Sequence, residues 1–187
     1  MVKLLCDHGA SPLSKNASND TVLMFCGSGA SEKHPIGTDP PEFGKVARYL
    51  LDTGVRVDYV NKNGLNVLHC AANSFDVIST ITEWCAESES RKTQLAQAIH
   101  QKTVLGDTPL HMAAEDGNAH VIAALLAADA DPLAVNKAGK IPSACTSDQV
   151  SLSVLKSAEN VAHQRYREKQ DLLLAELSGE ASNNARS

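Results

Sequence analysis

Aromatic residues are scarce in this 187-residue chain, where Phe, Trp and Tyr together make up 4% of the sequence. A surface that stacks nucleic-acid bases on aromatic rings is therefore not expected. An excess of basic charge is also missing, because 17 Lys and Arg are set against 22 Asp and Glu, for a net charge of −5. This balance provides no general attraction to nucleic acid or to an anionic membrane.

Long apolar runs and paired cysteines are absent as well. No run approaches the roughly 18 apolar residues that a membrane span needs, and the first residues turn polar too early for a signal peptide. The five cysteines are odd in number and include no Cys-x-x-Cys. This pattern favours reduced thiols and hence the cytoplasm or nucleus, with secretion and disulfides as the alternative.

Residues that carry catalysis or bind metals do not occur at useful spacings. His69 and Cys70 would point about 100° apart on a helix, and the segment His111–Glu115 lacks the second histidine of a zinc motif. Gly27–Ala30 lacks the lysine of a phosphate-binding loop. Nothing near the pair Glu115-Asp116 would raise one pKa for acid–base work. We therefore expect no catalytic residue, no cofactor and no metal.

What the chain does contain is an internal repeat. The clearest unit is Gly-Asp-Thr-Pro-Leu-His-Met-Ala-Ala-Glu-Asp-Gly at 106–117, and Gly139 follows Gly106 at a distance of 33. Gly-Leu-Asn-Val-Leu-His-Cys-Ala-Ala at 64–72 fills the same slots, and Thr-Val-Leu-Met at 21–24 fills part of them. The distance from the end of one unit to the Thr slot of the next is 12 in three places, which fixes the register independently.

Local physics indicates two short helices in each unit. Thr108 can cap a first helix with Pro109 in its first turn, and Leu110 would face inward. Gly117 would separate that helix from an antiparallel second one, whose apolar stripe recurs at helical spacing over 121–126. Because one such pair cannot bury its own apolar face, neighbouring units must stack. We expect Thr21, Asn66 and Thr108 each to begin a first helix.

The Gly-x-Thr-Pro-Leu-His-x-Ala-Ala pattern with period 33 resembles the ankyrin-repeat family. The resemblance covers about four-fifths of the chain and is most specific at 106–131. It implies an all-α solenoid of stacked helix-turn-helix units with projecting finger loops. It also implies that His69 and His111 tie neighbouring loops together through hydrogen bonds to the backbone.

The function implied is a protein–protein interaction module or scaffold, monomeric on its own, that binds another protein through its concave face and fingers without catalysis. The alternative is a targeting fragment of a longer ankyrin-containing enzyme. Leu65, Val104 and Leu105 are the apolar finger residues, which either contact a partner or pack on a neighbouring finger. The full predicted protein-binding set is Asp20, Lys62, Asn63, Leu65, Asn73, Val104, Leu105, Asp107, Glu115, Asp116, Lys137 and Lys140.

The repeats depart from the pattern in several places. Thr21 and Gly54 are 33 residues apart where Thr108 and Asp129 are 21 apart, so we expect a proline-rich surface loop near 31–42. Residues 87–92 break the apolar pattern, and Leu95, Ala96 and Ile99 are expected to form one further turn before Gly106, so that the next finger is longer or partly helical. The chain opens inside a repeat, which favours a segment of a longer array over a native half-repeat.

Repeat four is degenerate, because Ile141 replaces the capping Thr. A long helix over Ser151–Leu177 is expected to close the array, with Glu159 facing water and Arg167 pairing with Asp171. A short coiled coil of its distal leucines is the rival interpretation. The expected organisation is an array at 1–150 (partial repeat 1–15, repeat 16–60, repeat 61–102 with an insertion near 86–97, repeat 103–135, degenerate repeat 136–150), a helix at 151–178 and a mobile tail at 179–187.

Overall fold

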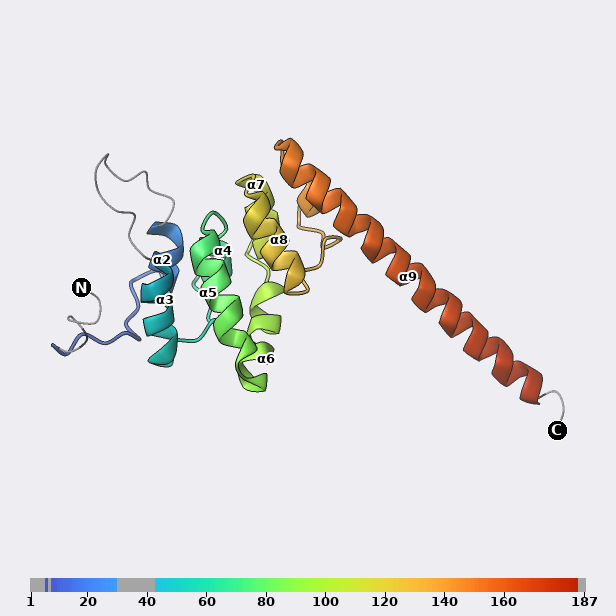
Figure 1. Cartoon of the computed structure of the whole chain (residues 1–187), viewed down its shortest axis with the longest axis horizontal. Coiled ribbons are helices and arrows are strands. Elements are labelled where there is room, and N and C mark those ends of the chain that lie inside the picture. Colours follow the sequence, from blue (N-terminus) through green and yellow to red (C-terminus); the bar gives the residue numbers. More distant parts are fainter. Residues whose placement is uncertain (1–5, 7, 30–42, 185–187) are drawn as a thin grey trace.

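In the computed structural model, successive helices pack side by side in chain order (Figure 1). The structure describes residues 6, 8–29 and 43–184, with side chains up to Leu174. Within this part the only strand-like feature is an isolated bridge between Lys15 and Thr21. The prediction of an all-helical stack is confirmed. The helices are α2 (Val22–Gly29), α3 (Phe43–Asp52), α4 (Val67–Cys70), α5 (Phe75–Ala86), α6 (Glu89–Ile99), α7 (Pro109–Glu115), α8 (Ala119–Ala127), the 3-10 helix η1 (Pro142–Ala144) and α9 (Gln149–Asn184).

Capping chemistry explains where the first helices begin. Helices α2, α4 and α7 start directly after Thr21, Asn66 and Thr108, as the repeat register predicts. The Oδ1 atom of Asn66 accepts hydrogen bonds from the backbone N–H groups of Leu68 (3.0 Å) and His69 (3.2 Å). These bonds satisfy donors that the first turn of a helix leaves open.

The core lies between paired helices and between successive pairs. In the best-matched repeat, Leu110 of α7 and Val121, Ile122 and Leu125 of α8 are fully buried. Small residues allow close approach elsewhere: a Cβ added to Gly27 of α2 would lie 2.8–2.9 Å from the backbone at the end of α4. The array is therefore a continuous apolar layer rather than a set of separate units.

The insertion in repeat two is a complete helix, so the prediction of one further turn was wrong. Helix α6 begins at Glu89 and runs for 11 residues, with only Ala98 and Ile99 buried. A helix this polar carries no apolar periodicity, which is why the sequence pattern did not reveal it.

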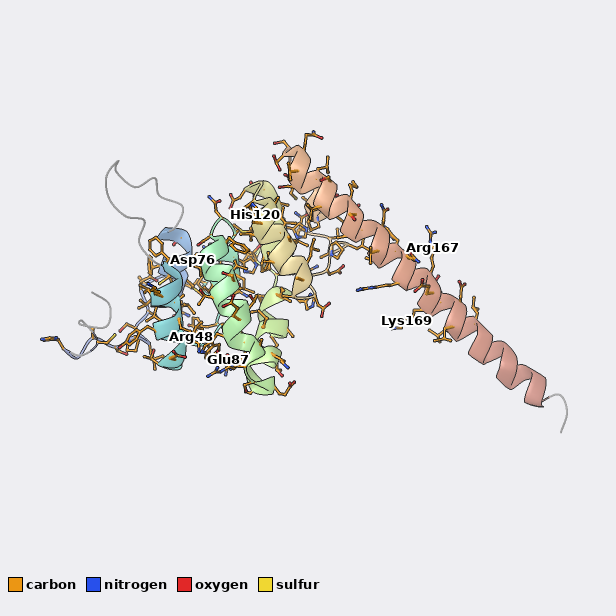
Figure 2. All side chains as sticks on the ribbon, in the orientation of Figure 1. Arg48, Asp76, Glu87, His120, Arg167 and Lys169 are labelled. Carbon is orange, nitrogen blue, oxygen red and sulfur yellow. The ribbon has the colours of Figure 1, made fainter. Side chains whose placement is uncertain are left out.

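Charged contacts hold α6 against the array. The Arg91 guanidinium lies 3.9 Å from the centre of the Trp84 ring and 2.7 Å from the Glu87 carboxylate. Glu87 also lies 2.7 Å from Arg48 of α3, and Figure 2 shows this pair at the lower end of the array. The Trp84 indole N–H donates to Asp52 (2.9 Å), so the cluster joins α3, α5 and α6.

Helix α9 both closes the stack and leaves it. Its first turns pack on α8 and η1, and Ser151, Leu155 and Glu159 are buried there. Glu159 was expected to face water, but the end of the array covers it and Lys156 pairs with it at 2.8 Å. From His163 to Leu174 every side chain is exposed, and the helix projects away from the array (Figure 1).

Helix α9 is also longer than predicted. It continues to Asn184, because no proline follows Pro142 and Gly179 alone does not stop it. The helix therefore includes most of the segment predicted as a tail from 179. The expected pair of Arg167 with Asp171 is not among the ion pairs of the described residues.

One expectation concerns residues outside the described part of the chain. The loop insertion near 31–42 falls within residues 30–42.

Candidate functional site

Four five-residue hairpins form the finger row, at 16–20, 61–65, 103–107 and 136–140. In each finger the backbone N–H of the first residue donates to the carbonyl of the fifth, at 2.9–3.1 Å. The fourth residue of each turn has a positive φ, a backbone conformation that glycine adopts at little cost. Those residues are Asn19, Gly64, Gly106 and Gly139, with φ between 71° and 84°.

Neighbouring fingers are joined to one another by backbone hydrogen bonds. The N–H of Lys62 donates to Ser18 (3.1 Å), that of Val104 to Asn63 (3.0 Å), and that of Lys137 to Leu105 (3.0 Å). Side chains add a second connection, because Asn61 donates to Asp20 at 2.6 Å and Asn136 donates to Asp107 at 2.7 Å. The finger row is therefore a connected, pre-ordered surface.

This arrangement separates the predicted binding residues into two kinds. The carboxylates of Asp20 and Asp107 hold neighbouring fingers together, and hydrogen bonds from Asn61 and Asn16 lower the pKa of Asp20. Leu65 is half-buried. Of the predicted residues on the fingers, those whose side chains remain exposed are Lys62, Asn63, Val104, Leu105, Lys137 and Lys140.

Two buried histidines support the fingers from below, as the resemblance implied. The Nε2 atom of His69 lies 3.2 Å from the Asp107 carbonyl, and that of His111 lies 3.1 Å from the Lys140 carbonyl. Each Nδ1 accepts from the backbone N–H that precedes its own helix, at Asn66 and Thr108 (both 3.2 Å). A neutral ring with its hydrogen on Nε2 satisfies both contacts.

Stability is expected to fall at mildly acidic pH because of His69. Burial lowers the pKa of this ring from 6.5 to about 4, against the opposing effect of its backbone hydrogen bonds. The unfolded chain thus binds the proton more tightly, so the contribution is complete above about pH 6.5 and declines toward pH 4, by up to about 3 kcal/mol. Urea melts at several pH values measure this decline.

The matched variant for the pH experiment is His69→Gln, which stays polar and does not titrate. It should be less stable than the natural chain near neutrality, and its free energy of unfolding should vary less between about pH 6.5 and 4.5. Parallel pH profiles for the two chains would show that His69 does not cause the decline.

The first helices form a floor beside the fingers, which sequence reasoning did not select. Phe25, Cys70, Met112 and Cys145 occupy the same slot in α2, α4, α7 and directly after η1, and these elements are successive neighbours. Phe25 is 54% exposed and the other three are half-buried. The register alone could have identified this row, because each member follows the slot of His69 and His111.

Acidic and polar groups lie at the ends of these helices. Asn73, Glu115 and Asp116 are exposed. The expectation that nothing near Glu115 and Asp116 raises a pKa was wrong, because partial burial of the Asp116 carboxylate and the nearby Glu115 raise the pKa of Asp116. Asn118 donates to the carbonyl of Asn73 at 3.2 Å, which links two neighbouring units. The surface thus has lysines on its fingers and carboxylates at the helix ends.

The described residues contain no group of three or more His, Cys, Asp or Glu that could hold a metal ion. Burial raises the pKa of the thiols of Cys26, Cys70 and Cys85 to about 11, so they remain protonated near neutrality and are poor nucleophiles. In the part of the chain that the structure describes, no helix is both long and apolar enough to span a membrane.

Comparisons with known proteins agree with the repeat register. The ankyrin-repeat family model matches residues 105–137, which include α7 and α8. A relative from Mus musculus, protein phosphatase 1 regulatory subunit 27, is 29% identical over 101 residues, which are 53% of this chain. The matched region spans 58% of the length of that relative.

Proposed function

Because the chain is an ankyrin-repeat protein, we propose that it is a non-catalytic binding subunit that holds a partner protein against its finger row and helical floor. The exposure of Val104 and Leu105 carries this proposal. These side chains are 55% and 66% exposed at the tip of one finger.

The finger that presents them is fixed on both sides. The Val104 N–H donates to the preceding finger, and the Leu105 carbonyl accepts from the next one. Within the finger, the Thr103 hydroxyl accepts from the N–H groups of Leu105 and Asp107, both at 3.2 Å. Apolar side chains on a pre-ordered backbone lose little entropy on binding, which favours them as contacts with a partner.

Charge on the same surface indicates the chemistry of the partner. Lys62 lies on the finger before Val104, and Lys137 and Lys140 lie on the finger after it. A complementary surface is apolar at its centre, with acidic groups facing these lysines. The acids at the helix ends, Glu115 and Asp116, would face basic groups of the partner.

We infer a protein phosphatase 1 catalytic subunit as the first partner to test. The support is the likeness to a mouse protein that is named as a regulatory subunit of this phosphatase. A regulatory role also agrees with the surface, which presents exposed side chains for contact with a protein. The thiols of Cys26, Cys70 and Cys85 are protonated and therefore poor nucleophiles.

The double variant Val104→Ser/Leu105→Ser is expected to bind the phosphatase at least about tenfold more weakly than the natural chain, because it loses the central apolar contact. Isothermal titration calorimetry with the purified catalytic subunit measures this change. Phe75→Ser is the matched control, since Phe75 is 50% exposed but lies on the second helix of its pair, away from the fingers.

The two parts of the proposal fail separately. Equal affinity of the double variant and the natural chain would show that the finger tip is not the contact. No binding by the natural chain would refute the phosphatase as partner.

A further inference from the structure

The projecting part of α9 carries apolar side chains that the array does not cover. Tyr166 and Leu172 are each 62% exposed, and Leu173 is 50% exposed. We propose that this part of the helix pairs antiparallel with the same segment of a second copy, so that the chain forms a homodimer. The dimer replaces the monomer expected from the sequence, and it does not depend on the proposed partner.

The face in question continues the face that closes the array. At about 100° per residue, Tyr166, Lys169 and Leu173 follow the side of the helix on which Leu155 and Ala162 pack. A groove of about 590 Å³ opens on this side, between α9 and the loop after α8. Its walls include Leu126, Asp129, Asp131, Pro132 and Leu133 on the array and Ala158, Ala162, Arg165, Tyr166 and Lys169 on α9.

Charges along this face favour a second copy over an unrelated occupant. Arg165 and Lys169 are four residues apart on the helix, a spacing at which like charges repel one another. No ion pair among the described residues involves either of them. The sequence has glutamates at 176 and 180, again four apart and in the same helical register as the two cations.

The order of these charges makes the segment complementary to itself. Two cations come first, Leu172 and Leu173 follow, and two acidic positions come last. In an antiparallel pair that crosses at the two leucines, position 165 of one copy lies opposite 180 of the other, and 169 lies opposite 176. The two cations of each copy then face the two glutamates of the other copy. A single straight helix cannot bring its own cations and glutamates together in this way.

The length of α9 makes this pairing feasible. The segment from Ala162 to position 180 covers about five turns, which is longer than two heptads. In the antiparallel arrangement, the last turn of α9 in the second copy would lie opposite Ala162. Figure 2 shows Arg167 and Lys169 on different sides of the projecting helix, and the proposed pairing uses the side of Lys169.

Sedimentation-velocity and light-scattering measurements on the full chain, under reducing conditions and over about a hundredfold range of concentration, test the proposal. The natural chain should dimerise reversibly. Lys169→Glu and Glu176→Lys should each raise the dissociation constant about tenfold or more, because each places like charges opposite one another at two symmetric positions. The combined Lys169→Glu/Glu176→Lys variant should restore affinity to within about threefold, since it exchanges the charges and keeps the pairing.

Further variants separate this interface from other surfaces. Leu172→Gln/Leu173→Gln should abolish the dimer, whereas Val150→Gln, an exposed residue in the first turns of the same helix, should leave it intact. Val104→Ser/Leu105→Ser should dimerise like the natural chain even if it loses its partner.

A monomer at all concentrations would overturn the proposal, and so would a dimer that ignores the charge exchange. Binding of the monomer to anionic vesicles through Leu172 and Leu173 would also overturn it, and would identify a lipid surface as the occupant.

Discussion

Ending the chain after Asp148 is expected to lower the free energy of unfolding by about 3–5 kcal/mol, because the cut removes the helix that covers the last complete repeat. Leu155 is fully buried, and Ser151 and Glu159 are buried with it. Without α9, the apolar side of α8 would be exposed to water. Urea unfolding followed by circular dichroism measures the loss, with aggregation as a second sign of the uncovered surface.

The matched control for this truncation is a chain that ends after Gln164. Among the side chains of α9 that the structure describes, it keeps every buried or half-buried one and removes only the projecting part. Its stability, measured at a dilution where the natural chain is monomeric, should stay within about 1 kcal/mol of the natural value. If the two truncated chains melt alike, α9 is an appendage and does not close the array.

The repeat register was predictable because it depends on local chemistry that recurs. Thr21, Asn66 and Thr108 each precede a helix, since a polar side chain at that slot can satisfy open backbone donors of the first turn. The histidine contacts were implied by the resemblance to the ankyrin-repeat family. A period that repeats several times gives several independent checks on one assignment, which a single motif does not.

Features without a period were not predictable in the same way. Helix α6 is polar over most of its length, and it is held by Arg91 on Trp84 and by Glu87. Glutamate is a residue type that usually lies on the surface, and Glu159 is buried only because it packs against the end of the array. The length of α9 depends on the absence of a stop signal rather than on the presence of a pattern.

The candidate surface was predicted in part. The sequence selected the finger residues by their register, and the structure shows that Asp20 and Asp107 bind neighbouring fingers while Val104 and Leu105 remain exposed. That difference depends on side-chain contacts between residues 29 or 41 positions apart, which no local pattern contains. The sequence analysis did not select the exposed floor residue Phe25, although Phe25 occupies the slot that follows those of His69 and His111.

The last prediction concerns the interface between helices of the best-matched repeat. Leu110 of α7 and Leu125 of α8 are both fully buried, and α7 and α8 pack on one another. Leu110→Ala and Leu125→Ala should therefore each lower the free energy of unfolding by about 2–5 kcal/mol, from lost apolar burial and the cavity that remains. Denaturant melts of the two variants test this, and a loss under about 1 kcal/mol at either site would show that it is not core.

Leu105→Ala provides the control within the same repeat. Leu105 is 66% exposed, so its truncation should change stability by no more than about 0.5 kcal/mol. Because Leu110 and Leu125 lie on neighbouring helices, the loss in the double variant need not equal the sum of the two single losses. Since each repeat is covered only by its neighbours, a cavity between α7 and α8 should loosen the finger that carries Val104 and Leu105 before it affects the distant α2.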